Sequence, residues 1–261
     1  MRRLIAFPCE EDQLLGSLDE ADGTTGLLIV SGGNELRSGA HRGMAMLAAT
    51  LAAEGTPVFR YDRRGVGDSG GANRGFRAAR ADLLAACGAF RREAPQVAAL
   101  VAFGNCDAAT LLAHHGRDAG IDRVLLANPW VVEPRDDLPP APAIRAHYAA
   151  RLRDPATWRR LLTGGVSIGK LIRGLRRISQ NGPQNDPFTA GVLAAIAAWG
   201  TDARIILAEQ DATAIAYADA ARRAGIAPRT LTVRTASHSF ARPADAAALA
   251  AAIRDLVTAR E

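Results

Sequence analysis

The sequence predicts an α/β fold built on a mostly parallel sheet, and three observations predict it. Short apolar runs alternate with Ala-rich helical stretches, which is the pattern of βαβ units. The chain has 261 residues, a length that suits one large domain. Hydrophobic residues make up 48% of it, enough to bury a sizeable core and to exclude a disordered chain. We therefore expect an eight-stranded, mostly parallel sheet with helices on both faces.

The apolar runs give the order of the expected elements. Strands are expected at residues 2–8, 12–18, 26–30, 57–61, 98–103, 124–127, 205–208 and 230–233, the first two being antiparallel across an acidic turn. Helices are expected at about 41–54, 75–94 and 243–259, with another beginning just after residue 105. Between 130 and 200 the alternation breaks, and prolines, tryptophans and many arginines follow. This predicts a core formed by residues 1–129 and 201–261, with a helical cap insertion at 130–200.

Charge and cysteine content narrow the class of protein. The net charge is +5, but the arginines are scattered among helical stretches, without zinc-finger spacing or an RNA-binding aromatic run. We therefore expect no nucleic-acid partner. Three cysteines form no CxxC pair, which favours a reducing compartment. The apolar run at the N-terminus stops at Pro8, and no stretch is long enough to span a membrane. These features predict a cytoplasmic protein without an integral membrane segment. The sequence does not determine the oligomeric state.

The strongest chemical signal is the turn Gly104-Asn105-Cys106-Asp107-Ala108 between a strand and a helix. A nucleophile elbow has this form, with small residues two positions to either side of the nucleophile. A helix N-terminus and a nearby imidazolium both favour the thiolate form of a cysteine, so Cys106 is the candidate nucleophile. The alternative is an inert core thiol, since free cysteine is often buried.

Two partners follow in the chain order nucleophile, acid, histidine. Asp211 comes shortly after the 205–208 run, and His238 lies between the 230–233 run and the last helix. Asp211 is the candidate acid, with an N-cap role as the alternative and Glu209 in reserve. His238 is the candidate base, with a surface loop histidine as the alternative. His238 is the one histidine after Asp211, which favours catalysis.

The oxyanion hole is expected to combine two backbone amides, those of Asp107 and Asn34. Asn34 follows Gly32-Gly33 in the loop after the third strand, where glycines let the backbone turn its amides inward. Arg37, His41 and Arg42 follow the same loop and are candidates for binding an anionic substrate group.

Residues 62–69, with the pattern Asp-x-Arg-Gly-x-Gly-x-Ser, form a glycine-rich loop after the fourth strand. It lacks the Gly-Lys-Ser/Thr of a phosphate-binding loop and the spacing of a dinucleotide fingerprint. No His, Cys and Asp cluster has metal-ligand spacing. We therefore expect no cofactor and no metal.

Taken together, these motifs resemble the exosortase A system-associated hydrolases of type 1, within the α/β-hydrolase superfamily. The resemblance spans nearly the whole chain, and its motifs are Gly32-Gly33, Arg37 with His41-Arg42, the 62–69 loop, Gly104-x-Cys106-Asp107-Ala108-Ala109, Leu125-x-x-Asn128-Pro129-Trp130, Trp158-Arg159-x-Leu161-Leu162 and the contexts of Asp211 and His238. It implies an α/β-hydrolase fold and a cysteine-based triad, with a link to exopolysaccharide and protein-sorting systems. The chain departs from the family pattern at Asn34-Glu35-Leu36, where a proline and aromatic residues are expected, and at Ser38-Gly39-Ala40, where Gly-Ser is expected.

Three functions are therefore open. The first is hydrolysis of a small-molecule or carrier-bound acyl ester or thioester through an acyl-cysteine, and the second is acyl transfer by the same triad. The third is a non-catalytic binding or scaffold protein with this fold, which the intact Cys, Asp and His order disfavours. The basic residues of the predicted cap either attract an acidic acyl donor or form a solvated helix face, the latter being favoured; they are Arg145, Arg151, Arg153, Arg159 and Arg160.

Overall fold

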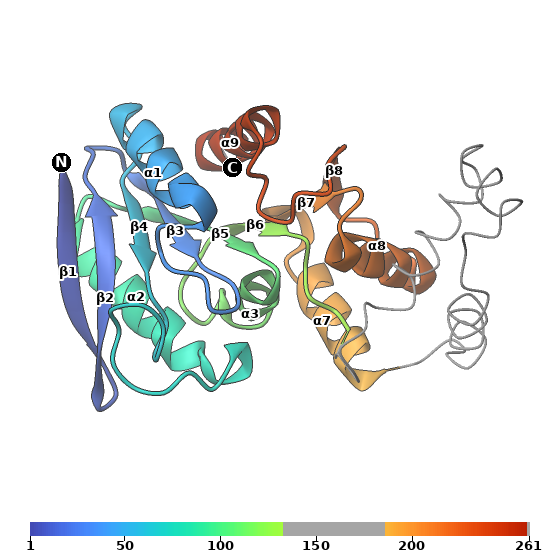
Figure 1. The fold of residues 1–261 in the computed structure, drawn as a ribbon, viewed down its shortest axis with the longest axis horizontal. Coiled ribbons are helices and arrows are strands. Elements are labelled where there is room, and N and C mark those ends of the chain that lie inside the picture. Colours follow the sequence, from blue (N-terminus) through green and yellow to red (C-terminus); the bar gives the residue numbers. More distant parts are fainter. Residues whose placement is uncertain (133–185, 260–261) are drawn as a thin grey trace, which may run out of the picture.

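The computed structural model describes residues 1–132 and 186–259. They form one eight-stranded sheet with the strand order β1-β2-β4-β3-β5-β6-β7-β8 (Figure 1). The strands are β1 Arg2–Cys9, β2 Asp12–Asp19, β3 Thr25–Val30, β4 Val58–Tyr61, β5 Ala99–Asn105, β6 Arg123–Ala127, β7 Ala203–Ala208 and β8 Arg229–Val233. β2 runs antiparallel to β1 and β4, and all other pairs are parallel. The predicted eight-stranded sheet with an antiparallel start is confirmed.

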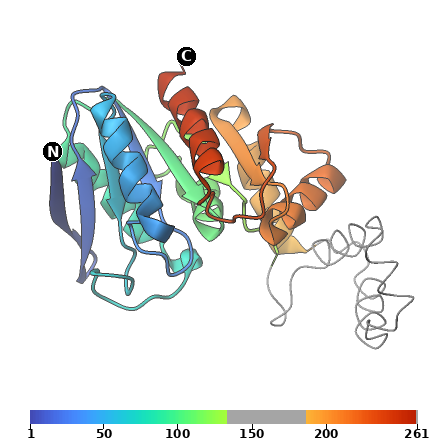
Figure 2. The same ribbon diagram turned by 45° about the horizontal axis from the view of Figure 1, so that its top comes forward.

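Helices cover both faces of this sheet (Figures 1 and 2). One face carries α1 Gly43–Ala53 and α9 Pro243–Thr258; the other carries α2 Arg80–Glu93, α3 Asp107–His115, α7 Pro187–Ala197 and α8 Ala212–Ala224. Successive residues of a strand point to opposite faces, so Leu27 and Ile29 pack toward α1 and α9, while Leu28 and Val30 pack in the other layer. Short 3₁₀ helices lie at Ala40–Arg42, Phe76–Ala78 and Gly200–Asp202.

Two helices start later than the sequence predicts. The helix expected from about residue 41 begins at Gly43, because His41 and Arg42 have φ values of 51° and 61° and cannot continue into a right-handed helix. The helix expected from about residue 75 is a 3₁₀ turn first, and α2 begins at Arg80.

The predicted cap insertion, residues 130–200, is described at its two ends. At the second end, α7 packs against α3 and α8 and buries Val192, Leu193 and Ile196 in the main core. The rest of the predicted cap, with Trp158 and its five arginines, lies outside the described residues, so the domain division remains a prediction. Within 1–132 and 186–259, no helix is long and apolar enough to cross a membrane.

A buried ion pair joins the sheet to the loop after β3. The Arg60 side chain on β4 is 2% exposed, and its Nη2 lies 3.0 Å from Oδ2 of Asp19 on β2. Arg60 Nη1 donates to the Arg37 carbonyl at 2.7 Å, and the Arg37 amide donates to Asp62 Oδ1 at 2.6 Å. This chain of charge-assisted bonds fixes the 31–39 loop against the carboxyl ends of the strands.

Replacing Asp19 by alanine is expected to lower the free energy of unfolding by about 3–5 kcal/mol, because it leaves the buried Arg60 guanidinium without its counter-charge. Urea denaturation followed by circular dichroism measures this change. Asp22→Ala, on an exposed neighbouring position, is the matched control and should stay within about 0.5 kcal/mol of wild type. Equal effects of the two substitutions would contradict the role given to the ion pair.

Candidate active site

The turn that joins β5 to α3 holds Cys106 in a strained conformation. Its φ of 61° and ψ of −123° lie where a non-glycine residue is rare. A Cβ on Gly104 would approach the Ala108 backbone to 2.9 Å, so the strand and helix pack too closely there for a larger residue. The Cys106 amide donates to the Ala127 carbonyl at 2.9 Å. These contacts hold the half-buried thiol at the carboxyl edge of the sheet.

The other two cysteines have a different environment. Cys9 and Cys87 are 3% and 1% exposed. Burial, together with the nearby Asp82 carboxylate, raises the pKa of Cys9 to about 11. Burial raises the pKa of Cys87 to about 12. Both are therefore neutral thiols at pH 7, and neither is exposed to a reagent as Cys106 is.

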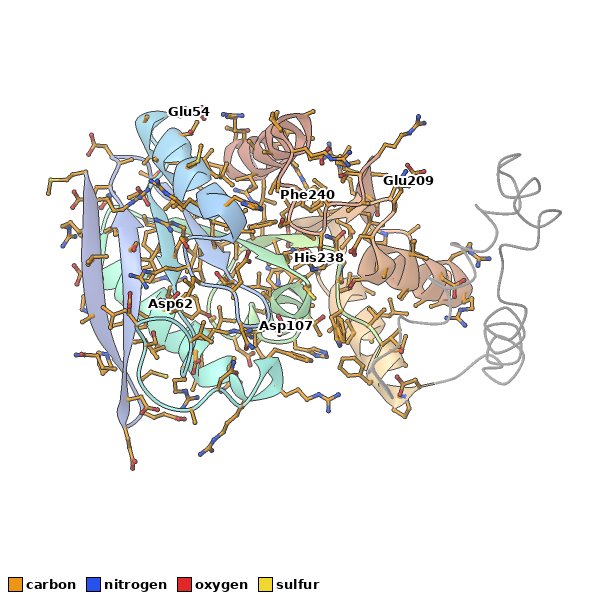
Figure 3. The ribbon with its side chains drawn as sticks, in the orientation of Figure 1. Glu54, Asp62, Asp107, Glu209, His238 and Phe240 are labelled. Atoms are coloured by element: carbon orange, nitrogen blue, oxygen red, sulfur yellow. The ribbon has the colours of Figure 1, made fainter. Side chains whose placement is uncertain are left out.

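Asp211 and His238 lie together at the ends of β7 and β8. Nδ1 of His238 is 3.0 Å from Oδ1 of Asp211, and the Cys106 side chain is close enough to the imidazole to contribute to its raised pKa. The other carboxylate oxygen of Asp211 accepts from the amides of Thr213 and Ala214, each at 3.0 Å, and caps α8. Asp211 therefore makes both contacts that the sequence offered as alternatives, one through each oxygen. His238 lies in the middle of the molecule, above Asp107, whereas Glu209 points outward (Figure 3).

The pKa values of His238 and Asp211 are shifted in opposite directions, and both shifts favour the charged forms. The interaction with Asp211, followed by that with the neighbouring Cys106 side chain, raises the pKa of His238 to about 10. Burial works to raise the pKa of Asp211, but the bonds from His238 and from the Ala214 amide outweigh it, so this pKa lies below its usual value. The arrangement thus favours an imidazolium between a carboxylate and the cysteine sulfur.

Two asparagines that the sequence analysis did not place in the site hold the His238 backbone. The Nδ2 groups of Asn105 and Asn128 donate to the His238 carbonyl at 3.0 and 3.1 Å. Asn128 Nδ2 also reaches Asn105 Oδ1 at 3.0 Å, and Asn128 Oδ1 accepts from the Ala208 amide at 2.8 Å. Asn128 is fully buried with a φ of 41°, a conformation that asparagine tolerates better than most residues. One side chain therefore links the ends of β5 and β7 to the histidine loop.

The loop after β3 approaches the elbow through its glycines. The position of a Cβ on Gly32 would be 2.9 Å from Asp107 Oδ1 and 3.5 Å from Cys106 Cβ. The Gly33 amide donates to Asp107 Oδ1 at 2.7 Å, a contact that the sequence analysis missed although it singled out both glycines. In the part of the chain that the structure describes, the backbone amide of Asn34 donates no hydrogen bond. The Asn34 side chain accepts from Asn73 Nδ2. The oxyanion role of the Asn34 and Asp107 amides stays a prediction.

The three candidate substrate-binding residues lie in the loop after β3 and at the start of α1, and their binding role remains a prediction. The Arg37 guanidinium is bound to Asp62, Ser17 and Asp68, so it has a structural partner on each side. His41 and Arg42 are exposed at the start of α1. Among residues 1–132 and 186–259, no cluster of His, Cys, Asp and Glu side chains could hold a metal ion.

Comparison with solved structures identifies the fold. The chain is similar to the α/β-hydrolase GrgF from a Penicillium species, with a TM-score of 0.63 and 16% identity over 98% of both chains. An esterase from Pyrococcus furiosus matches with a TM-score of 0.64 and 15% identity, over 98% of this chain and 90% of that one. A serine hydrolase without a lid from Xanthomonas campestris matches with a TM-score of 0.59 and 15% identity, over 100% of this chain and 97% of that one. The chain therefore has the α/β-hydrolase fold. No family model and no curated protein matches the sequence.

Changing Asn128 to aspartate should misplace His238, because the new carboxylate cannot donate to the His238 carbonyl and repels it. We expect a loss of about 1–3 kcal/mol in unfolding free energy and a fall of about tenfold or more in the rate at which iodoacetamide labels Cys106. Gln96→Glu is the control, because it removes a single amide contact to the Ala21 carbonyl on the surface. An unchanged labelling rate in a folded Asn128→Asp protein would show that the network does not position the histidine.

The charge of His238 gives a pH-dependent prediction. With its pKa at about 10, the imidazole stays protonated through neutral pH and loses its proton only above that value. Asp211→Asn removes the largest cause of the shift, so the imidazolium should be lost at lower pH and Cys106 labelling at pH 8 should slow about tenfold. Labelling of each cysteine, followed by mass spectrometry from pH 6 to 10, measures this. Glu209→Gln should keep the wild-type profile, and a similar shift in both variants would argue against Asp211.

Proposed function

We propose that this protein is a cysteine-nucleophile α/β-hydrolase that cleaves acyl esters or thioesters through an acyl-cysteine intermediate. The observation that supports it is the His238 imidazole, whose Nδ1 pairs with Asp211 at 3.0 Å and whose pKa is raised by Asp211 and by the neighbouring Cys106 side chain. The strained turn at Cys106 adds to it, because such strain persists where the surrounding structure holds it in place for use.

The proposed reaction begins with the Cys106 thiolate, whose proton resides on His238. The sulfur attacks the acyl carbonyl carbon, and the carbonyl oxygen takes up the negative charge. As the tetrahedral intermediate collapses, the bond to the leaving oxygen or sulfur breaks and His238 gives that atom its proton. Asp211 keeps the imidazole oriented and stabilises its positive charge throughout.

Deacylation repeats the same steps with water. Neutral His238 takes a proton from water, the resulting hydroxide attacks the acyl-cysteine, and the carboxylic acid leaves as the thiolate re-forms beside the imidazolium. The amides of Asp107 and Asn34 are the proposed donors to the oxyanion in both halves. A thiolate suits thioesters and activated esters, whose leaving groups need little assistance. The link to exopolysaccharide and exosortase systems belongs to this proposal and is supported by the sequence motifs.

A panel of acyl-CoA, acyl-carrier and p-nitrophenyl esters tests the proposal against wild type and Cys106→Ala. We expect Cys106→Ala to lower kcat/KM by about a thousandfold or more, and intact mass spectrometry to detect an acyl adduct on wild type alone. Cys87→Ala, at a buried thiol away from the elbow, should keep both the activity and the adduct.

Three results would overturn parts of this assignment. Equal activity of wild type and Cys106→Ala would exclude the cysteine as nucleophile. Product that accumulates only when an acceptor alcohol is added would show acyl transfer in place of hydrolysis. Absence of both turnover and adduct across the panel, with unaccelerated Cys106 labelling, would favour a binding protein.

A further inference from the structure

A polar pocket of about 500 Å³ is lined by residues of which two also contact the 32–34 loop. It lies between the β1–β2 turn, the 63–75 segment and the start of α2, and its lining includes Arg63, Arg64 and Arg74. Two of its lining residues also contact the loop beside Cys106. Arg63 Nη2 donates to the Gly33 carbonyl, and Asn73 Nδ2 donates to Asn34 Oδ1 at 2.7 Å. The side chains of Arg63 and Asn73 therefore connect the pocket to the candidate oxyanion loop.

Arg63 is a buried cation with an unused donor. Its side chain is 4% exposed, and its Nη2 lies 3.4 Å from Asp107 Oδ2 in addition to its bond with Gly33. Its Nη1 is buried and has no hydrogen-bond partner among residues 1–132 and 186–259. A charged donor left unsatisfied in a protein interior carries a desolvation cost, and a bound water or ion is one explanation for such a group.

The remaining charges of the pocket define what kind of anion fits. Arg64 is used internally, since its Nε lies 2.6 Å from Asp82 Oδ1 and its Nη1 contacts Glu10. Arg74 is exposed and forms no ion pair with any residue of the described ranges. Two carboxylates, Glu11 and Asp12, also line the pocket without a cationic partner in these ranges.

Two arginines, Arg63 with one donor left without a partner and Arg74 without an ion pair in the described ranges, thus line the same cavity as two carboxylates. A ligand with one negative charge pairs with the arginines, whereas a second negative charge meets Glu11 and Asp12 at a cost. The same carboxylates accept hydrogen bonds from hydroxyl or amino groups. The pocket chemistry therefore selects a monoanion that also carries several hydrogen-bond donors.

We propose that this pocket is a binding site for a small polyhydroxylated or amino-bearing molecule with a single carboxylate, which Arg63 and Arg74 hold. The carboxylate pairs with the two guanidinium groups, and the donors of the ligand bind Glu11 and Asp12. The proposal concerns binding alone and does not depend on the acyl chemistry of Cys106. Through Arg63, the bound carboxylate lies next to the loop that approaches the elbow.

Isothermal titration calorimetry of the full chain tests the site with three probes: gluconate, acetate and inorganic phosphate. Gluconate has one carboxylate and several hydroxyls, acetate has the carboxylate alone, and phosphate carries more charge. We expect gluconate to bind at one site, acetate at least fivefold more weakly, and phosphate no more tightly than acetate. Arg63→Met and Arg74→Met should each weaken gluconate binding about tenfold or more, because each removes a charge-assisted hydrogen bond.

Arg80→Met is the matched control, because Arg80 pairs with Asp118 on the surface and does not line the pocket. It should bind gluconate as wild type does. If Arg63→Met does not fold, Arg74→Met decides, since that exposed side chain has no ion pair to lose within the described residues. The absence of gluconate binding to wild type, an undiminished affinity in Arg74→Met, or tighter binding of phosphate than of gluconate would each overturn the proposal.

Discussion

The strained backbone turn at Cys106 is the constraint on which the candidate site depends. A positive φ at a non-glycine residue persists only when neighbouring contacts fix it, and here they do so from both sides. The Cys106 amide donates to the Ala127 carbonyl of β6, and the Cys106 carbonyl accepts from the Trp130 amide at 3.2 Å. Gly104 lets the helix that follows begin directly against the strand. The turn therefore directs the thiol out of the sheet and places Cys106 at the start of α3.

The parallel sheet supplies the remaining geometry. Parallel strands have their carboxyl ends at one edge, so the residues that follow β5, β7 and β8 meet there although more than a hundred positions separate Cys106 from Asp211 and His238. Asn128, at the end of β6, connects those ends by side-chain hydrogen bonds. The position of the imidazole thus depends on backbone that belongs to four neighbouring strands.

Charge is balanced tightly around the elbow. Asp107 places a carboxylate beside the cysteine, where a like charge would oppose a thiolate. Arg63 lies 3.4 Å from that carboxylate, and the Cys106 side chain contributes to the raised pKa of His238. The same arginine lines the neighbouring polar pocket, so the electrostatics of pocket and elbow share one buried cation.

The sequence by itself determined the sheet, the elbow and the order of Cys106, Asp211 and His238, because alternating apolar runs and turn residues are local signals. It did not reveal that Asp211 divides its oxygens between His238 and the α8 N-terminus, nor that Asn105 and Asn128 hold the histidine backbone. It placed Arg37 among the substrate-binding candidates but did not reveal the ion pair of that residue with Asp62. These relations join residues distant in the chain, and only the tertiary structure decides them, since hydrogen-bond partners and burial depend on how the strands are packed side by side.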